Sequence, residues 1–190
     1  MEKSKSRSLT FKIATAGILL AIIIVMQLIK NVSPFISGPI INACMMIAII
    51  EVGIWAGVGF AIVVPIISLL FAFASPTTAL AFTTYGASVG IIIVGNLIFL
   101  LLGKFGSKQN LVLFILFLLL GALFKWFFMW ASGEYIIKQY FELGDLMGVV
   151  TKIFSTLQLW AGLISVPIIV AVKKVLDIRK RPAKEAEQKA

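Results

Sequence analysis

Histidine is absent from this sequence of 190 residues, cysteine occurs once, and acidic residues number only 8. The absence of histidine excludes zinc motifs built on imidazole ligands and any catalytic triad that contains histidine. The single cysteine, Cys44, excludes an internal disulfide, and its position in an apolar run indicates a small packing residue. We therefore expect this chain to work without a metal ion and without a cofactor.

Charged residues are scarce as well, whereas apolar residues dominate. Hydrophobic residues make up 61% of the chain and charged residues 13%, against about half and a quarter in ordinary soluble proteins. Apolar runs of about 18–25 residues recur along the chain, and each is long enough to cross roughly 30 Å of hydrocarbon. Because spans in lipid must satisfy their own backbone hydrogen bonds, we predict that these runs are helices. The predicted fold class is an all-α polytopic membrane protein.

Polar and turn-forming segments divide the chain into six predicted transmembrane helices. The breaks fall at Asn31–Pro39, Glu51–Gly53, Ser75–Thr78, Gly103–Asn110 and Ser132–Gly148. The predicted spans are Leu9–Ile29, Ile40–Ile50, Ile54–Phe73, a fourth that ends near Leu102, Leu111–Ala131 and Val149–Val172. We accordingly predict a basic tail at residues 1–8, one membrane domain at 9–174 and a charged, solvated tail at 175–190.

The basic residues decide the orientation of these spans. An even number of spans puts both termini on one side, and 13 of the 17 Lys and Arg lie in the N-terminal segment, the fourth-to-fifth loop or the C-terminal tail. The positive-inside rule then predicts that both termini are cytoplasmic. Since these cations would face anionic lipid, we expect membrane lipid and no nucleic acid as their partner. The predicted location is a cell membrane, and the composition fits a bacterial plasma membrane.

No catalytic signature is present in the sequence. There is no Gly-rich phosphate loop with its Lys, no Ser or Cys beside a base, and no cluster of carboxylates. Glu51 is the only acid near the interior of a predicted span, and its position at a cytoplasmic turn favours a solvated residue over a proton-coupling role. We predict that the chain is not an enzyme and has no energy source of its own.

Lys125 is the one basic residue deep inside a predicted span. It lies before the outer end of Leu111–Ala131, at a depth of about 9 Å if each residue rises by about 1.5 Å. A cation there is costly unless it snorkels to the headgroups, pairs with an acid or faces a wet cavity. No acid exists at a matching depth in another span. Two interpretations stay open: Lys125 snorkels outward, or it meets the anionic group of a solute in an outward-open cavity.

Further polar and aromatic residues accompany Lys125. Trp126 and Trp130 suit either interfacial anchors or a stacking surface for a flat ring. Side-chain amides inside spans suit either hydrogen bonds between helices or a solute site. We take as the candidate solute site Asn42, Tyr85, Asn96, Lys125, Trp126, Trp130 and Gln158.

Small residues recur at helical spacing in the first span. Gly17 and Ala21 lie about one turn apart, with Ala14 on a nearby face, and this spacing allows another helix to approach closely. Packing within the bundle is the default explanation. A docking face for a partner is the alternative.

The layout resembles that of the substrate-binding S components of energy-coupling factor (ECF) vitamin transporters. The features that match are the chain length, six spans with both ends inside, the Ala/Gly-rich first span, the Pro/Gly-containing loop Ser33–Pro39 and the pair Gly95-Asn96. The resemblance covers nearly the whole chain. It implies capture of a vitamin or related micronutrient from outside the cell, with a membrane coupling subunit and two ATPase subunits as partners.

The resemblance also implies roles for two segments. The first external loop would gate the ligand, which assigns this role to Asn31, Ser33, Pro34, Ser37 and Gly38. The first span would dock on the coupling subunit through an Ala-x-x-x-Ala pattern; position 18 is Ile here, so the docking candidates are Ala14, Gly17 and Ala21. Two other functions stay open: a non-transporting membrane scaffold or assembly protein, and an integral-membrane enzyme acting on lipids.

Overall fold

Helices dominate the structure, as expected for apolar runs that satisfy their own backbone hydrogen bonds. The computed structural model describes residues 2–29, 33–73, 82–140, 151 and 153–188. The elements in these ranges are α1 (Glu2–Ile29), α2 (Pro34–Glu51), α3 (Ile54–Phe73), α4 (Phe82–Gly106), α5 (Leu111–Ser132), the π-helical turn η1 (Gly133–Ile137), α6 (Lys138–Tyr140), the π-helical turn η3 (Ile153–Leu157) and α8 (Gln158–Gln188). The described ranges contain no strand.

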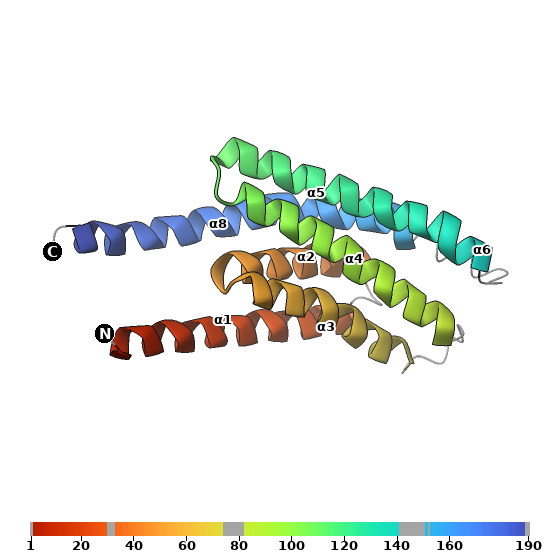
Figure 1. Cartoon of the computed structure of the whole chain (residues 1–190), viewed down its shortest axis with the longest axis horizontal. Helices are drawn as coiled ribbons and strands as arrows, with labels where there is room; N and C mark the ends of the chain where they lie inside the picture. The colour runs from red at the N-terminus through yellow and green to blue at the C-terminus, as the bar shows by residue number, and fades with distance from the viewer. Residues whose placement is uncertain (1, 30–32, 74–81, 141–150, 152, 189–190) are drawn as a thin grey trace.

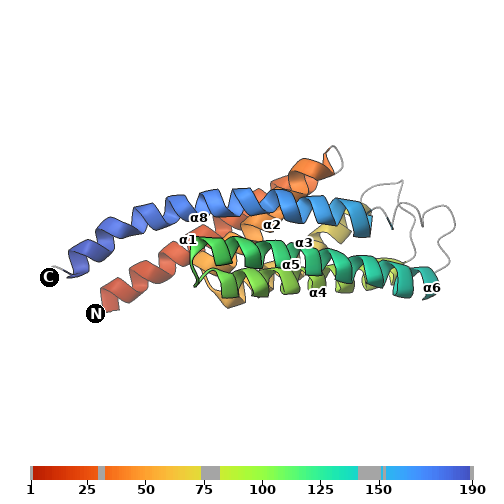
Figure 2. The same cartoon turned by 90° about the horizontal axis from the view of Figure 1, so that it is seen from above.

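Successive helices run in alternate directions along the long axis of the molecule (Figure 1). The start of α1 and the end of α8 lie at the same end of the bundle, together with the α2–α3 and α4–α5 turns (Figure 1, Figure 2). We call the half nearest these chain ends the terminal half and the other the distal half. The distal half is formed by the end of α1, the start of α2, the end of α3, the start of α4, the second half of α5 and the start of α8.

The helix lengths are those of a multi-pass membrane protein. Segments long and apolar enough to cross a membrane, within the described residues, are Leu9–Ile29, Ser88–Gly106, Leu111–Tyr140 and Phe154–Ile178. The segments Phe35–Glu51 of α2 and Ile54–Ser68 of α3 are shorter apolar helices. The predicted fold class, an all-α polytopic membrane protein, is confirmed.

Two segments predicted as loops are helical. α2 begins at Pro34, earlier than predicted, because proline at a first helical position loses no hydrogen bond through its missing N–H. Gly133–Tyr140 continues α5 through η1 and α6, and a pair between Lys138 Nζ and Glu134 Oε2 at 3.2 Å supports that extension. The two terminal segments likewise prolong α1 and α8 as helix. Hydropathy therefore located the apolar runs but not the helix ends.

The hydrophobic core follows α2, which packs against α1, α3, α4 and α8. Its side chains Met45, Met46 and Ile49 are almost fully buried. By contrast, only 11% of the apolar window of α1 is buried. α1 thus lies at the edge of the bundle and offers most of its surface to lipid or to a partner helix.

Candidate solute-binding site

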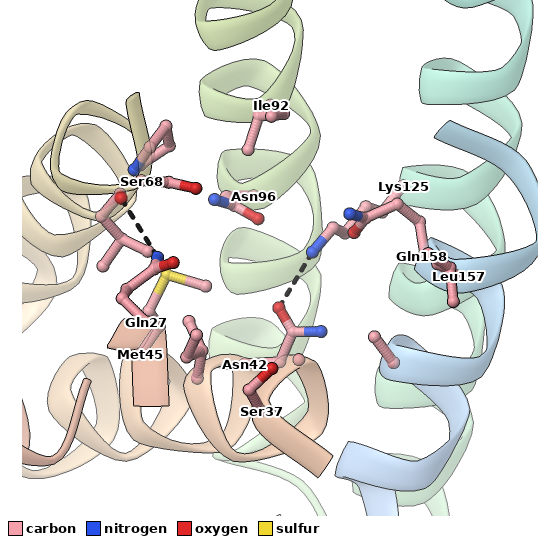
Figure 3. Close-up of a pocket in the computed structure, with 15 residues that line it drawn as sticks. Gln27, Ser37, Asn42, Met45, Ser68, Ile92, Asn96, Lys125, Leu157 and Gln158 are labelled. Carbon is pink, nitrogen blue, oxygen red and sulfur yellow. Dashed lines mark hydrogen bonds between the residues drawn. The ribbon is translucent and has the colours of Figure 1, made fainter. Parts of the chain in front are cut away.

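A cavity of about 280 Å³ lies in the distal half of the bundle (Figure 3). This volume is close to the lower end of the range for small-molecule sites, about 300–1,000 Å³, and suits a small solute. Apolar side chains form much of its wall. The polar side chains that line it are Gln27, Ser37, Asn42, Ser68, Asn96, Lys125 and Gln158, contributed by α1, α2, α3, α4, α5 and α8.

Lys125 of α5 points into this cavity and not toward lipid. Only 2% of the residue is exposed, and its Nζ donates to Asn42 Oδ1 of α2 at 2.9 Å (Figure 3). The Nζ also lies 5.8 Å from the centroid of the Phe99 ring, a weak cation–π contact. Because the helix continues to Tyr140, Lys125 is near the middle of a long helical segment instead of close to its outer end. The snorkelling interpretation is therefore wrong.

The hydrogen bond between Lys125 and Asn42 leaves mainly donors to face the cavity. An ammonium group has three N–H groups and no acceptor, so the oxygen of the Asn42 amide must face it. The Asn42 Nδ2 and the other ammonium N–H groups are then left for different acceptors. No acidic side chain is among the described residues that line the cavity. The described lining therefore provides no carboxylate to balance the lysine charge.

Gln27 of α1 lies across the cavity from Lys125 (Figure 3). The residue is 5% exposed, and its Nε2 donates to the backbone oxygen of Val64 in α3 at 3.3 Å. Its Oε1 is buried and has no hydrogen-bond partner in the described structure. Sequence reasoning missed this residue, and the only available signal was a lone amide within the apolar run Leu9–Ile29.

The structure brings a subset of the predicted site residues to one cavity: Asn42, Asn96, Lys125 and Gln158. Trp126 and Trp130 stack on each other, with ring centroids 6.4 Å apart, and are not among the described lining residues. The side chain of Tyr85 and the whole of Asn31 lie outside the described part of the chain. Ser68 is a second lining residue that sequence reasoning missed, because a single serine in an apolar helix carries little signal.

The described part of the predicted gate is a helical wall of the cavity and not a loop. Ser33 is the N-cap of α2, Pro34 is its first residue, and Ser37 and Gly38 follow within the helix. Ser37 and Gly38 both line the cavity, and Ser37 Oγ donates to the backbone oxygen of Ser33 at 3.1 Å. A Cβ atom added at Gly38 would lie 3.0 Å from Cβ of Ala161 in α8, so glycine allows α2 and α8 to meet here.

Within the described residues, two π-helical turns lie at the distal end of the bundle, one at the end of α5 and one at the start of α8. η1 follows α5, and η3 leads directly into Gln158 of α8. The two turns meet where Gly133 faces Phe154, with 3.5 Å between a Cβ added at Gly133 and the Phe154 Cβ. Such turns shift the register of a helix and are frequent at functional sites. Here the turn η3 sets the register at which Leu157 and Gln158 reach the cavity.

The predicted docking residues are exposed on α1. Ala14, Gly17 and Ala21 lie on one face of the helix, and a Cβ atom added at Gly17 would meet nothing within 4 Å. Ile18, on the same face, is 63% exposed. Within the described residues, this face of α1 is therefore largely uncovered. Docking of a partner on this face stays a prediction.

No protein-family model, no curated protein and no solved structure matches this chain. Across the described ranges, no group of three or more Cys, Asp or Glu side chains could hold a metal ion. The fold and the cavity together define a multi-pass α-helical membrane protein with a buried lysine beside a polar cavity.

Proposed function

We propose that this chain is the solute-capture subunit of an ECF-type importer and binds a small, vitamin-like solute that carries an anionic group. The observation that carries the proposal is the buried pair Lys125–Asn42, whose N–H groups face a cavity without an acidic side chain among its described lining. A buried cation without a counter-ion is costly, by roughly several kcal/mol. A carboxylate or phosphate on the solute would offset that cost. A lysine with a purely structural role, by contrast, would not need a cavity beside it.

The position of the cavity supports capture from outside the cell. Most of the described lining residues belong to the distal half, and the others, Met45 and Asn96, lie just past the midpoints of α2 and α4. If the positive-inside rule places the chain ends in the cytoplasm, the cavity falls in the outer half of the membrane. We infer that the membrane is a bacterial plasma membrane, in which the outer side is where a nutrient arrives.

The proposal includes partners, because an importer needs an energy source and this sequence has no phosphate-binding loop. In an ECF-type assembly, these partners are a membrane coupling subunit and two ATPase subunits. The exposed small residues Ala14, Gly17 and Ala21 support a docking face for the coupling subunit, since small side chains let two helix backbones approach closely.

Native mass spectrometry of the purified full-length chain tests the capture role. We expect wild-type protein to release a small molecule of defined mass, and the Lys125→Met variant to release none. Lys104→Met, which removes a lysine outside the cavity, is the matched control and should retain the molecule. Wild-type protein that holds no small molecule and is stabilised by none of a panel of vitamins and their precursors would contradict the proposal.

Affinity purification from native membranes after mild solubilisation tests the assembly. We expect two ATPase subunits and one further membrane subunit to be recovered with this chain. Recovery of other membrane proteins without any ATPase would favour the scaffold function instead.

A further inference from the structure

The carboxamide of Gln27 is held in one orientation at the wall of the cavity. Its Nε2 donates to the backbone oxygen of Val64 at 3.3 Å. Exchanging the nitrogen and oxygen of the amide would put two acceptors face to face, so the hydrogen bond itself assigns the two atoms. The Oε1 is therefore an acceptor, and it is buried without a partner in the described structure. A buried acceptor in this state costs free energy that a donor would recover.

This anchor ties the amide to the backbone of a neighbouring helix. Val64 and Pro65 of α3 both line the cavity, and Gln27 reaches Val64 from the end of α1. A backbone oxygen inside a helix keeps its place better than a flexible side chain does. The acceptor of Gln27 is therefore preorganised, which favours its use in recognition.

The two polar sides of the cavity have opposite hydrogen-bonding character. The ammonium group of Lys125 and the amide nitrogen of Asn42 offer N–H donors on one side, whereas Gln27 Oε1 offers an acceptor on the other. Figure 3 shows Gln27 and Lys125 on opposite sides of the cavity, with Asn96 of α4 between them. The apolar side chains of Met45 and Ile92 are also part of the wall, Met45 next to Gln27 and Ile92 above Asn96 in the view of Figure 3. A solute with a single polar group could satisfy only one side.

We infer that the solute is two-ended: its anionic group meets Lys125 and Asn42, and an O–H or N–H donor at its other end meets Gln27 Oε1. The substrate class is then a small hydroxy- or amido-substituted carboxylate or phosphate. This inference rests on the proposed capture function and adds the polarity of the second end.

A homologous series of ω-hydroxyalkanoates, HO–(CH₂)n–COO⁻ with n from 3 to 7, tests the inference. The series varies the distance between the two polar ends of the probe. The test therefore does not require the distance between the two polar sides of the cavity to be known in advance. Each member is compared with its O-methyl ether, which keeps the carboxylate but cannot donate, and with its primary amide, which loses the charge. Binding to the purified full-length chain in lipid nanodiscs is measured by thermal shift and by calorimetry.

At the chain length that binds best, we expect O-methylation to weaken binding to wild-type protein by about tenfold, the size of one lost hydrogen bond to a buried group. In Gln27→Leu the hydroxy acid and its methyl ether should bind within about twofold of each other, because the acceptor is gone. Gln158→Leu, which removes a different amide from the same cavity, should keep the tenfold preference. Gln27→Met provides a second variant of similar length if Gln27→Leu fails to fold.

Equal binding of hydroxy acid and methyl ether to wild-type protein would overturn the inference, as would a methylation penalty that survives in Gln27→Leu. Failure of every member of the series to bind would overturn it too. The capture function is judged separately: if carboxylates bind in a manner that depends on Lys125, or native mass spectra show a bound solute, that function stands and only the two-ended solute is lost. If neither carboxylate binding that depends on Lys125 nor a bound solute is observed, both the capture function and the two-ended solute are contradicted.

Discussion

Lys104 and Lys173 in the terminal half of the bundle are used differently from Lys125 in the distal half. In the terminal half, Lys104 Nζ donates to the backbone oxygen of Ile49 at 3.0 Å, near the C-terminal end of α2. Lys173 Nζ lies 4.5 Å from the ring centroid of Phe114 and 3.8 Å from Asp177 Oδ2. Each of these cations meets a carbonyl, an aromatic face or a carboxylate within the protein. They stabilise helix ends and helix contacts near the aqueous boundary.

In the distal half, Lys125 lies far from any helix end, is 2% exposed and meets one amide and a cavity. A cation near water stabilises a helix end at little cost, but a cation inside an apolar bundle is expensive. Depth and the chemistry of the partner, more than residue type, therefore separate a structural lysine from a candidate ligand-binding lysine.

The largest expected effect comes from replacing Lys125 by methionine, with the same replacement at Lys104 as the comparison. Lys125→Met should weaken solute retention at least about thirtyfold, because it removes a buried charge from its partner, while the solute-free protein should unfold at no lower temperature. Lys104→Met should retain the solute but lower the free energy of unfolding by about 1 kcal/mol, because the Ile49 oxygen loses its donor. Native mass spectra and thermal unfolding measure both. Retention of solute by Lys125→Met would remove the distinction between the two halves.

The second prediction separates solute capture from assembly. Gly17→Leu places a bulky side chain on the exposed small-residue face of α1 and should lower recovery of the ATPase and coupling subunits at least about tenfold, because two helices could no longer approach closely. Solute binding in the distal half should stay unchanged. Gly90→Leu on α4 is the control, since an added Cβ meets nothing within 4 Å at either glycine. Equal recovery of partners with both variants would show that α1 is not the docking face.

A third prediction concerns the packing behind Lys125. A Cβ atom added at Gly95 would lie 3.0 Å from Met129 Cγ and 3.5 Å from Lys125 Cγ. Gly95→Ala should therefore push Met129 aside and, through it, shift Lys125, which lies one turn earlier on α5. This shift should weaken solute binding about fivefold, the effect of roughly 1 kcal/mol of overpacking. Gly90→Ala on the same helix has open space and should leave solute binding as in wild type. If both variants bind alike, the position of Lys125 tolerates more movement than this packing suggests.

Much of the candidate site could be predicted because polar residues in lipid-spanning helices are rare and must find polar surroundings. Lys125, Asn42, Asn96 and Gln158 stand out from apolar runs for that reason, and the structure gathers them in one cavity. Gln27 does not stand out, since a glutamine close to the end of a span can be solvated at the headgroup region. Only the three-dimensional arrangement shows that its side chain donates a hydrogen bond to Val64 of α3 and lines the cavity.

The helix boundaries could be predicted less well, because hydropathy reports the surroundings of a residue and not its backbone conformation. Proline breaks a helix in its interior but is favoured at its first turn, so Pro34 begins α2 where a loop was expected. Glu134 and Lys138 form an i,i+4 pair that continues the helix after the apolar run has ended.

The smallest expected effect concerns Trp126 and Trp130, which lie on the same helix as Lys125. Trp126 follows Lys125 in sequence, but successive residues of a helix point about 100° apart, so nearness in sequence does not bring both to one cavity. Trp126 and Trp130 instead stack on each other along a neighbouring strip of the helix. Trp126→Phe and Trp130→Phe should each change solute affinity less than about twofold, the cost of altered stacking away from the site. A much larger loss in either variant, with folding intact, would return the aromatic side chains to the solute site and require the cavity to open toward them when the solute binds.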